Sequence, residues 1–281
     1  MTKSDDNPLY RTVISVEQLT LASPAPLVLD CRARLGDPSW AASAFEAGHL
    51  PGAQRLDLDR DLAAPPGDGG RHPLPAPETL ATTLANLGAA MDQPIVLYDD
   101  AGGAFAARGW WCIRWLGHSA VAVLDGGLPA WEAAGESLEC GPAAARDRGD
   151  FQQRNPLTQH IDAPQLEARL GSTDLWLVDA RSEARFRGEE EPIDPVAGHI
   201  PGALCRPFQR NLDDRGHFRT PAALAEEFRD WPDNPVLYCG SGVTAAHNAL
   251  AWVHACRGEP VLYPGSWSDW IRDPQHPVAT A

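Results

Sequence analysis

In Leu237-Tyr-Cys-Gly-Ser-Gly-Val-Thr-Ala-Ala-His-Asn248, an apolar run leads through a cysteine and two glycines into a segment that favours a helix. A similar run, Pro94-Ile-Val-Leu-Tyr98, occurs earlier in the chain, where Asp99 follows in the place of Cys239. Short β-branched or Leu-rich runs that alternate with helices are typical of a parallel sheet covered on both faces. The two stretches therefore indicate that one α/β arrangement occurs twice.

Three further pairs of landmarks occur in the same order in both halves. They are Leu27-Val-Leu-Asp-Cys-Arg32 with Leu175-Trp-Leu-Val-Asp-Ala-Arg181, Gly48-His-Leu-Pro-Gly-Ala53 with Gly198-His-Ile-Pro-Gly-Ala203, and Val121-Ala-Val-Leu-Asp-Gly-Gly-Leu-Pro-Ala-Trp131 with Val261-Leu-Tyr-Pro-Gly-Ser-Trp-Ser-Asp-Trp270. Ordered internal similarity of this kind indicates a duplicated domain. We expect an α/β protein of two tandem domains, residues 1–143 and 156–281, each a parallel sheet flanked by helices on both faces.

The helices and the connections follow from local signals. Capping residues open helices at Ser15 and Asp162, and apolar residues recur at helical spacing in 77–84 and 221–228. The polar run 141–156 lacks apolar periodicity, so we expect the link between the halves there.

The first half contains an insertion. Gly48 and Gly198 are 150 positions apart (198 − 48), whereas Asp99 and Cys239 are only 140 apart (239 − 99). The difference coincides with the Pro/Gly-rich run 63–72. Such an insertion predicts a surface loop, of the kind that in some proteins reaches the other copy.

The formal net charge of −15 excludes nucleic acid and an anionic membrane surface as partners, because both need a basic footprint. No run approaches the roughly 18 apolar residues of a membrane span, and the first eight residues lack the apolar core of a signal peptide. We therefore expect a soluble, cytoplasmic protein.

Six cysteines are scattered through the chain, and none belongs to a Cys-x-x-Cys pair. This spacing argues against a zinc ribbon and a thioredoxin-like redox motif. We expect most of the six to be small core residues. A functional cysteine must therefore be identified from its local sequence.

Cys239 has such a sequence, because it lies just before a predicted helix that stops at Gly258. Gly240 and Gly242 permit a tight loop whose backbone N–H groups turn inward and stabilise an anion. The anion of a cysteine is the thiolate, which is its nucleophilic form. Asp99 at the matching position cannot react in this way, and we do not expect an anion-binding loop to retain its carboxylate easily.

On these residues the chain resembles the two-domain rhodanese-type sulfurtransferases. The resemblance covers almost the whole chain and is carried above all by Cys239-Gly-Ser-Gly-Val-Thr-Ala245. This loop is similar to that of the 3-mercaptopyruvate sulfurtransferases, whereas thiosulfate-specific rhodaneses usually have basic residues after the cysteine. Thiosulfate carries a compact dianion beside its donated sulfur, and Gly240 and Ser241 offer it only dipoles.

The resemblance implies a double displacement. The Cys239 thiolate takes sulfur from 3-mercaptopyruvate, pyruvate leaves, and the persulfide passes its sulfur to a thiol acceptor such as thioredoxin or to cyanide. This chemistry uses no cofactor or metal, and we expect none. Thiosulfate stays open as an alternative donor.

The resemblance also assigns site residues. Cys239, Ser241, Asp59 and His72 are expected to be catalytic, with the last three forming a proton relay. Donor binding is assigned to Arg187 of Arg185-Phe-Arg-Gly188 and to four loop residues, namely Gly240, Gly242, Val243 and Thr244. The family commonly supplies a second Arg shortly afterwards, but residues 189–197 contain none.

The duplicated residues receive a structural assignment. His49 and His199 stand in both Gly-His-x-Pro-Gly turns, including the one in the half without a nucleophile, so we expect their imidazoles to bind backbone groups. The same reasoning makes the two Asp-x-Arg motifs part of the scaffold.

Two other classes of protein fit the sequence less well. Cysteine phosphatases and arsenate reductases on related folds use Cys-x5-Arg, but the sixth residue after Cys239 is Ala245. A non-catalytic binding module, as in rhodanese-like domains without cysteine, suits the first half. The intact loop of the second half argues against it for the whole chain.

Overall fold

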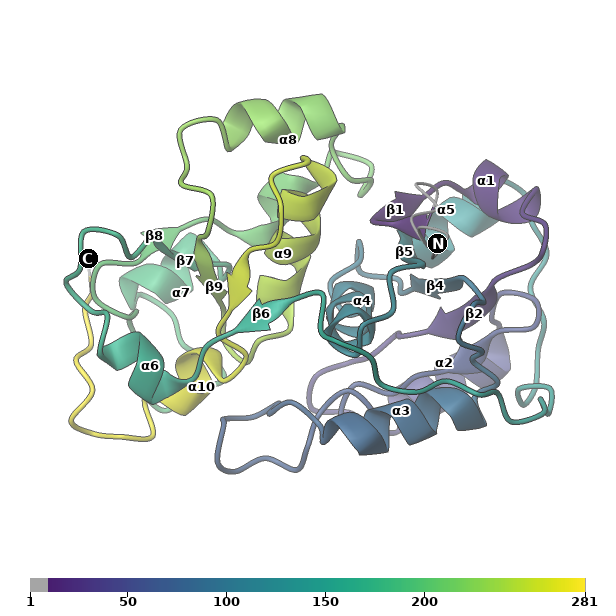
Figure 1. The fold of residues 1–281 in the computed structure, drawn as a ribbon, viewed down its shortest axis with the longest axis horizontal. Coiled ribbons are helices and arrows are strands. Elements are labelled where there is room, and N and C mark those ends of the chain that lie inside the picture. Colours follow the sequence, from purple (N-terminus) through teal and green to yellow (C-terminus); the bar gives the residue numbers. More distant parts are fainter. Residues whose placement is uncertain (1–9, 281) are drawn as a thin grey trace. The chain divides into compact units, whose positions relative to one another are not determined.

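The computed structural model describes residues 10–280, which form two α/β units (Figure 1). Unit 1 contains residues 10–62, Pro75–Leu157 and Asp214–Phe218. Unit 2 contains Ala63–Leu74, Thr158–Asp213 and the residues from Arg219 onward. Each unit thus includes a short segment from the other half of the chain.

Unit 1 has five parallel strands in the order β1-β5-β4-β2-β3. Its strands are β1 (Val13–Ile14), β2 (Leu27–Asp30), β3 (Gln54–Arg55), β4 (Ile95–Tyr98) and β5 (Val121–Leu124). Its helices are α1 (Val16–Thr20), α2 (Trp40–Ala47), α3 (Pro77–Asn86), α4 (Ala106–Trp115) and α5 (Gly127–Ala133).

Both faces of this sheet are covered, because all four residues of the central strand β4 are buried. On one face Val96 and Tyr98 pack in a cluster with residues of α1, α2 and α5. On the other, α4 approaches so closely that a β-carbon on Gly109 would lie 2.4 Å from the Leu97 side chain.

Unit 2 repeats this topology, with five parallel strands in the order β6-β10-β9-β7-β8. The strands are β6 (Gln159–His160), β7 (Leu177–Asp179), β8 (Leu204–Cys205), β9 (Val236–Tyr238) and β10 (Val261–Leu262). The helices are α6 (Ala163–Glu167), α7 (Glu183–Arg187), α8 (Pro221–Glu227), α9 (Thr244–His254) and α10 (Ser266–Trp270), together with the 3₁₀ helix η2 (Phe208–Asn211).

The core of unit 2 also lies on both sides of its sheet. Tyr238 belongs to a cluster that includes Leu166 of α6 and the tryptophans of α10. Helix α9 packs on β9 and β10, and α8 packs on α9 (Figure 1). The predicted fold class, two α/β domains with parallel sheets flanked by helices, is confirmed.

The two Asp-x-Arg motifs are the scaffold that the sequence predicted. The Arg32 guanidinium lies 2.6 Å from Asp30 and donates to the carbonyl of Gly48 at 2.8 Å. Arg181 lies 2.6 Å from Asp179 and donates to the carbonyl of Gly198 at 2.7 Å. These bonds hold the Gly-His-x-Pro-Gly turn against the sheet in each unit.

The two turn histidines confirm their structural assignment. His49 Nδ1 lies 2.8 Å from the carbonyl oxygen of Phe45, and His199 Nδ1 lies 2.7 Å from that of Phe186. Each imidazole also stacks on the phenyl ring of the same phenylalanine. Both rings are therefore held by neighbouring residues of their own unit.

The helix signals are confirmed with one difference at a C-terminus. Ser15 and Asp162 each form a complete capping box. Helix α9 ends at His254, earlier than the predicted stop at Gly258, because Cys256 already adopts a left-handed conformation with φ 59°.

The segment predicted as the link packs with unit 1. Residues 141–156 form no helix or strand. They are nevertheless packed, because Phe151 is buried and the N–H of Gly149 donates to the carbonyl of Ala85 at 2.8 Å. The boundary between the units falls after Leu157. The division at 143 and 156 stays a prediction from the sequence.

The inserted loop belongs to unit 2, as an insertion that reaches the other copy would. The N–H of Arg71 donates to Ser268 Oγ at 3.0 Å. Conversely, Asp214–Phe218 belongs to unit 1, where the N–H of Phe218 donates to the Asp125 carboxylate at 2.8 Å. Among the helices of residues 10–280, none combines the length and apolar character required to cross a membrane.

Candidate active site

Cys239 lies directly after β9, where its side chain is buried and its backbone is held by α10. Its N–H donates to Ser266 Oγ at 3.1 Å, and its carbonyl accepts the N–H of Trp267 at 2.9 Å. The carbonyl of Gly240 accepts the N–H of Ser268 at 2.9 Å. The backbone of Cys239 and Gly240 is thus fixed by three hydrogen bonds to residues of α10.

The expected inward N–H is present on Gly242, which donates to Cys239 Sγ at 3.1 Å. Gly242 has φ +76°, and a β-carbon there would lie 2.2 Å from the carbonyl oxygen of Pro264. Only glycine fits this position. Val243 is buried just before α9 and Thr244 is its first residue, so the sulfur lies near a helix N-terminus.

Ser266 is the unusual residue of this site. It is fully buried and has φ 56°, a conformation that costs a residue with a β-carbon roughly 1–2 kcal/mol. Its hydroxyl accepts from Cys239 and donates to the carbonyl of Tyr263 at 2.9 Å. A strained residue that bonds the nucleophile's backbone indicates a functional constraint.

Asp99 corrects one expectation from the sequence. Its carboxylate is fully buried and accepts four backbone N–H groups, those of Ala101, Gly103, Phe105 and Ala106, at 2.8 to 2.9 Å. The loop retains the carboxylate because it satisfies both oxygens. Burial nevertheless raises the pKa of Asp99 against the lowering effect of these bonds.

His72 and Ser241 are brought together by the inserted loop. His72 Nδ1 lies 2.7 Å from Ser241 Oγ, and both side chains are buried in unit 2. Ser241 follows the nucleophile by two residues. An imidazole bonded to a hydroxyl beside a reactive sulfur can carry a proton.

Asp59 lies in the other unit. It is an exposed residue of unit 1, and its N–H donates to the Asp57 carboxylate at 3.0 Å. Its part in the relay stays a prediction.

Arg187, which the resemblance assigned to the donor's carboxylate, forms ion pairs with neighbouring glutamates. Its side chain is 40% exposed and pairs with Glu183 at 3.0 Å and Glu189 at 2.9 Å. Arg185 and Arg187 are two positions apart on the short helix α7, so their side chains point in different directions. The motif alone therefore does not show which of them faces the loop after Cys239. Arg185 does: a β-carbon on Gly240 would lie 3.4 Å from its guanidinium.

Arg71 is a site residue that the sequence reasoning missed. One of its terminal nitrogens would lie 3.0 Å from a β-carbon on Gly240, closer than Arg185. It comes from the inserted loop, next to His72. Its position there was the available signal, because a loop that delivers a histidine to a site delivers its neighbours as well.

Two carboxylates hold these arginines. Arg185 donates to Glu191 at 2.7 Å and to Asp194 at 3.2 Å, and Arg71 bonds the other oxygen of Asp194. Burial raises the pKa of Asp194 against the lowering effect of Arg71. For Glu191 burial also acts to raise the pKa, but the bond from Arg185 and two backbone N–H groups lower it.

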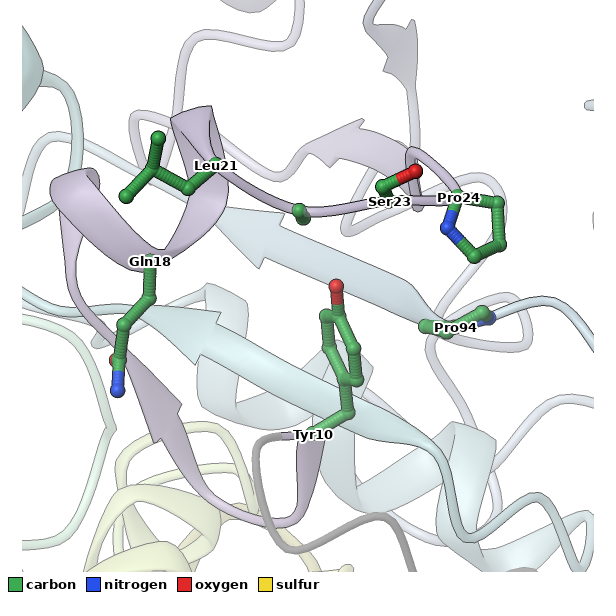
Figure 2. A pocket seen from close by; sticks show the side chains of 7 residues that line it. Tyr10, Gln18, Leu21, Ser23, Pro24 and Pro94 are labelled. Atoms are coloured by element: carbon green, nitrogen blue, oxygen red, sulfur yellow. The ribbon is translucent and has the colours of Figure 1, made fainter.

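A hollow of about 400 Å³ lies elsewhere in unit 1. It is lined by apolar, amide and hydroxyl side chains around the ring of Tyr10. Figure 2 shows Gln18 and Leu21 on one side of it and Pro24 and Pro94 on the other. This lining contains no thiol, imidazole or guanidinium.

Comparison with known proteins agrees with this geometry. The family model described as rhodanese-like domain matches residues 15–134 and 162–273. The chain therefore belongs to the rhodanese-like family and contains two such domains. The first matched range contains β2 to β5, and the second contains β7 to β10.

Individual relatives narrow the class. A Pseudomonas aeruginosa protein named as a probable 3-mercaptopyruvate sulfurtransferase is 51% identical over 95% of this chain and 98% of its own. The thiosulfate sulfurtransferase of Gallus gallus is 31% identical over 96% of this chain and 97% of its own. The solved 3-mercaptopyruvate sulfurtransferase from Leishmania major is 28% identical, with a TM-score of 0.82 over 94% of this chain and 76% of its own.

Proposed function

We propose that this protein is a sulfurtransferase that moves sulfur from 3-mercaptopyruvate to a thiol or cyanide through a persulfide on Cys239. The observation that carries the proposal is the Gly242 N–H bonded to a buried cysteine sulfur at the junction of β9 and α9. The 51% identity to a protein named for the same donor supports the choice of substrate.

In the first step the Cys239 thiolate attacks the sulfur of 3-mercaptopyruvate. A sulfur–sulfur bond forms, the carbon–sulfur bond breaks, and its electron pair leaves on carbon as the enolate of pyruvate. The enolate then takes a proton to give pyruvate. The Gly242 N–H stabilises the sulfur throughout, because a loop donor costs no reorganisation during the reaction.

The proton for the enolate comes from Ser241 with His72 behind it. The hydroxyl and the imidazole are already bonded at 2.7 Å, so a proton that leaves Ser241 is replaced from His72. We keep Asp59 as a proposed third member of this relay. The variant Asp59→Asn tests it by the rate of pyruvate release.

Arg185 rather than Arg187 is the proposed partner of the donor's carboxylate. Its guanidinium lies beside Gly240, the residue after the nucleophile, and its planar donors suit a carboxylate. The backbone of Gly240, Gly242, Val243 and Thr244 shapes the rest of the donor site.

In the second step an acceptor attacks the outer sulfur of the persulfide. The sulfur–sulfur bond breaks, the Cys239 thiolate returns, and the product is a thiol persulfide or, from cyanide, thiocyanate. A small protein thiol such as thioredoxin is the proposed acceptor class. We place this reaction in the cytoplasm, where thiols are kept reduced.

Thiosulfate is the second candidate donor, favoured by the 31% identity to a thiosulfate sulfurtransferase. Steady-state turnover with each donor, followed as pyruvate and thiocyanate, separates the two. We expect 3-mercaptopyruvate to have the higher kcat/KM. A much higher value for thiosulfate would overturn the donor assignment.

A further inference from the structure

The charges around Gly240 balance one another. Six ionised side chains of unit 2 form one connected group of ion pairs, defined here as the Gly240 charge cluster. Its members are Arg71, Asp179, Arg181, Arg185, Glu191 and Asp194. Three guanidinium groups meet three carboxylates, so the cluster has no net charge.

Asp194 is the central member on the side of the loop. Its side chain is 3% exposed, and its two oxygens bind different arginines, Arg71 and Arg185. Those are the two guanidinium groups that a β-carbon on Gly240 would meet. Asp194 therefore orients both groups and cancels one of their two positive charges, while Glu191 cancels the other through Arg185.

A guanidinium that is paired still has donors to offer. Arg has five N–H groups. Arg185 uses Nε and Nη2 for Glu191 and Asp194, and Arg71 uses Nη1 for Asp194, so part of each set is left for a ligand. Arg71 is 28% exposed and Arg185 is 16% exposed, so neither is sealed off. The site can bind an anion by hydrogen bonds without an excess of positive charge.

Such a site distinguishes anions by their charge. With its thiol protonated, 3-mercaptopyruvate has one negative charge, whereas thiosulfate has two. The Gly240 charge cluster is neutral, so it does not compensate the second negative charge of thiosulfate. That charge is repelled by the Cys239 thiolate, and the repulsion is substantial at an effective dielectric constant of about 20. Donor preference then depends on the charge of Asp194.

We infer that Asp194, held between Arg71 and Arg185, is a specificity-determining residue that selects a singly charged sulfur donor over a dianion. Arg71 is then a second donor-binding group beside Arg185, and Asp194 positions both. The inference rests on the proposed sulfur transfer and adds to it the side chain that sets donor charge. No loop side chain from residues 240–242 is required for this selection.

The test measures kcat/KM for 3-mercaptopyruvate and for thiosulfate in wild type and in Asp194→Asn. Asparagine has nearly the same shape and removes one negative charge. We expect the ratio of thiosulfate to 3-mercaptopyruvate to rise by about tenfold. The matched control is Glu189→Gln, which removes an exposed carboxylate from the Arg187 pair and is expected to leave the ratio unchanged.

Arg71→Gln and the double variant Arg71→Gln/Asp194→Asn complete the design. Loss of Arg71 alone is expected to lower thiosulfate turnover several-fold more than 3-mercaptopyruvate turnover. The double variant, which restores neutrality, should return the ratio toward wild type. A merely structural role would lower both donors together in all three variants.

An unchanged ratio in folded Asp194→Asn overturns the inference and leaves the proposed function standing. If that variant does not fold, an equal loss of both donors in Arg71→Gln overturns it. The proposed function fails separately, if wild-type protein releases no pyruvate from 3-mercaptopyruvate.

Discussion

The loop after β4 and the loop after β9 have the same anchoring but different occupants. In unit 1 four N–H groups surround the carboxylate of Asp99; in unit 2 the N–H of Gly242 contacts the sulfur of Cys239. The carbonyl of Asp99 accepts the N–H of Leu128, as that of Cys239 accepts the N–H of Trp267. The comparison teaches that the anion-binding loop belongs to the scaffold and its occupant decides the chemistry.

The support behind each loop shows where the sulfur site departs from the scaffold. Gly127 in unit 1 and Ser266 in unit 2 both have left-handed backbones, with φ 58° and 56°. Glycine adopts this conformation without strain, and a β-carbon on Gly127 would lie 2.2 Å from the carbonyl oxygen of Asp99. In unit 2 Ser266 is strained, but its hydroxyl accepts a hydrogen bond from the N–H of Cys239.

The largest expected effect is the loss of the nucleophile. Cys239→Ser should lower turnover by at least about 10³-fold, because an alcohol does not form the persulfide. Cys205→Ser is the matched control, since burial and then Asp179 raise the pKa of the Cys205 thiol to about 11 and leave it protonated at neutral pH. The rate of pyruvate release measures both variants. Turnover by Cys239→Ser would contradict the claim that the thiol of Cys239 distinguishes the loop after β9 from the loop after β4.

Next in size is the carboxylate partner. Arg185→Met should raise KM for 3-mercaptopyruvate by roughly 10- to 100-fold, because the charge-assisted hydrogen bonding of its guanidinium to the donor's carboxylate is lost. Arg185→Lys should recover part of this. Arg187→Met is the control and should change KM by less than about threefold, because its ion pairs are exposed. Equal effects at the two positions would contradict the assignment of Arg185.

Asp99→Asn tests the occupied loop of unit 1. The amide presents N–H groups to backbone donors that now meet a carboxylate oxygen, so we expect a loss of about 2–3 kcal/mol in the free energy of unfolding. Urea denaturation measures it. Asp100→Asn, which weakens a pair with the partly exposed Arg34, should cost less than about 1 kcal/mol. Unchanged stability in Asp99→Asn would show that the loop does not depend on its carboxylate.

The smallest expected effect separates strain from function at Ser266. Ser266→Gly and Ser266→Ala both remove the hydroxyl, so persulfide formation should slow in both by roughly tenfold. Only glycine relieves the backbone, so its variant should be more stable than the alanine variant by about 1 kcal/mol. Stopped-flow rates and thermal unfolding measure the two quantities. Wild-type rates in both variants would remove Ser266 from the account.

The fold could be predicted from the sequence because its signals are local and occur twice. Apolar runs, caps and the duplicated Asp-x-Arg and Gly-His-x-Pro-Gly motifs each act within one unit. The position of Cys239 at the end of a strand followed from the same pattern. His72 was predicted from resemblance, and the structure brings it to Ser241.

Side-chain direction and partners between distant residues could not be predicted in the same way. Arg185 and Arg187 differ by two positions on a short helix, and only the packing of the chain shows which one faces Gly240. Arg71 bonds Asp194 across 123 positions, for which the sequence has no periodic signal. The retention of the Asp99 carboxylate could not be predicted either, because the sequence does not show that four backbone N–H groups converge on it.

The central claim is that only one of the two loops carries transferable sulfur. Mass spectrometry of peptides from protein incubated with 3-mercaptopyruvate tests it most directly, with cyanide added to a second portion. We predict one added sulfur on the peptide that contains Cys239, none on the other five cysteines, and its loss with cyanide. An unmodified Cys239 with an active donor preparation, or sulfur on another cysteine, would contradict the account.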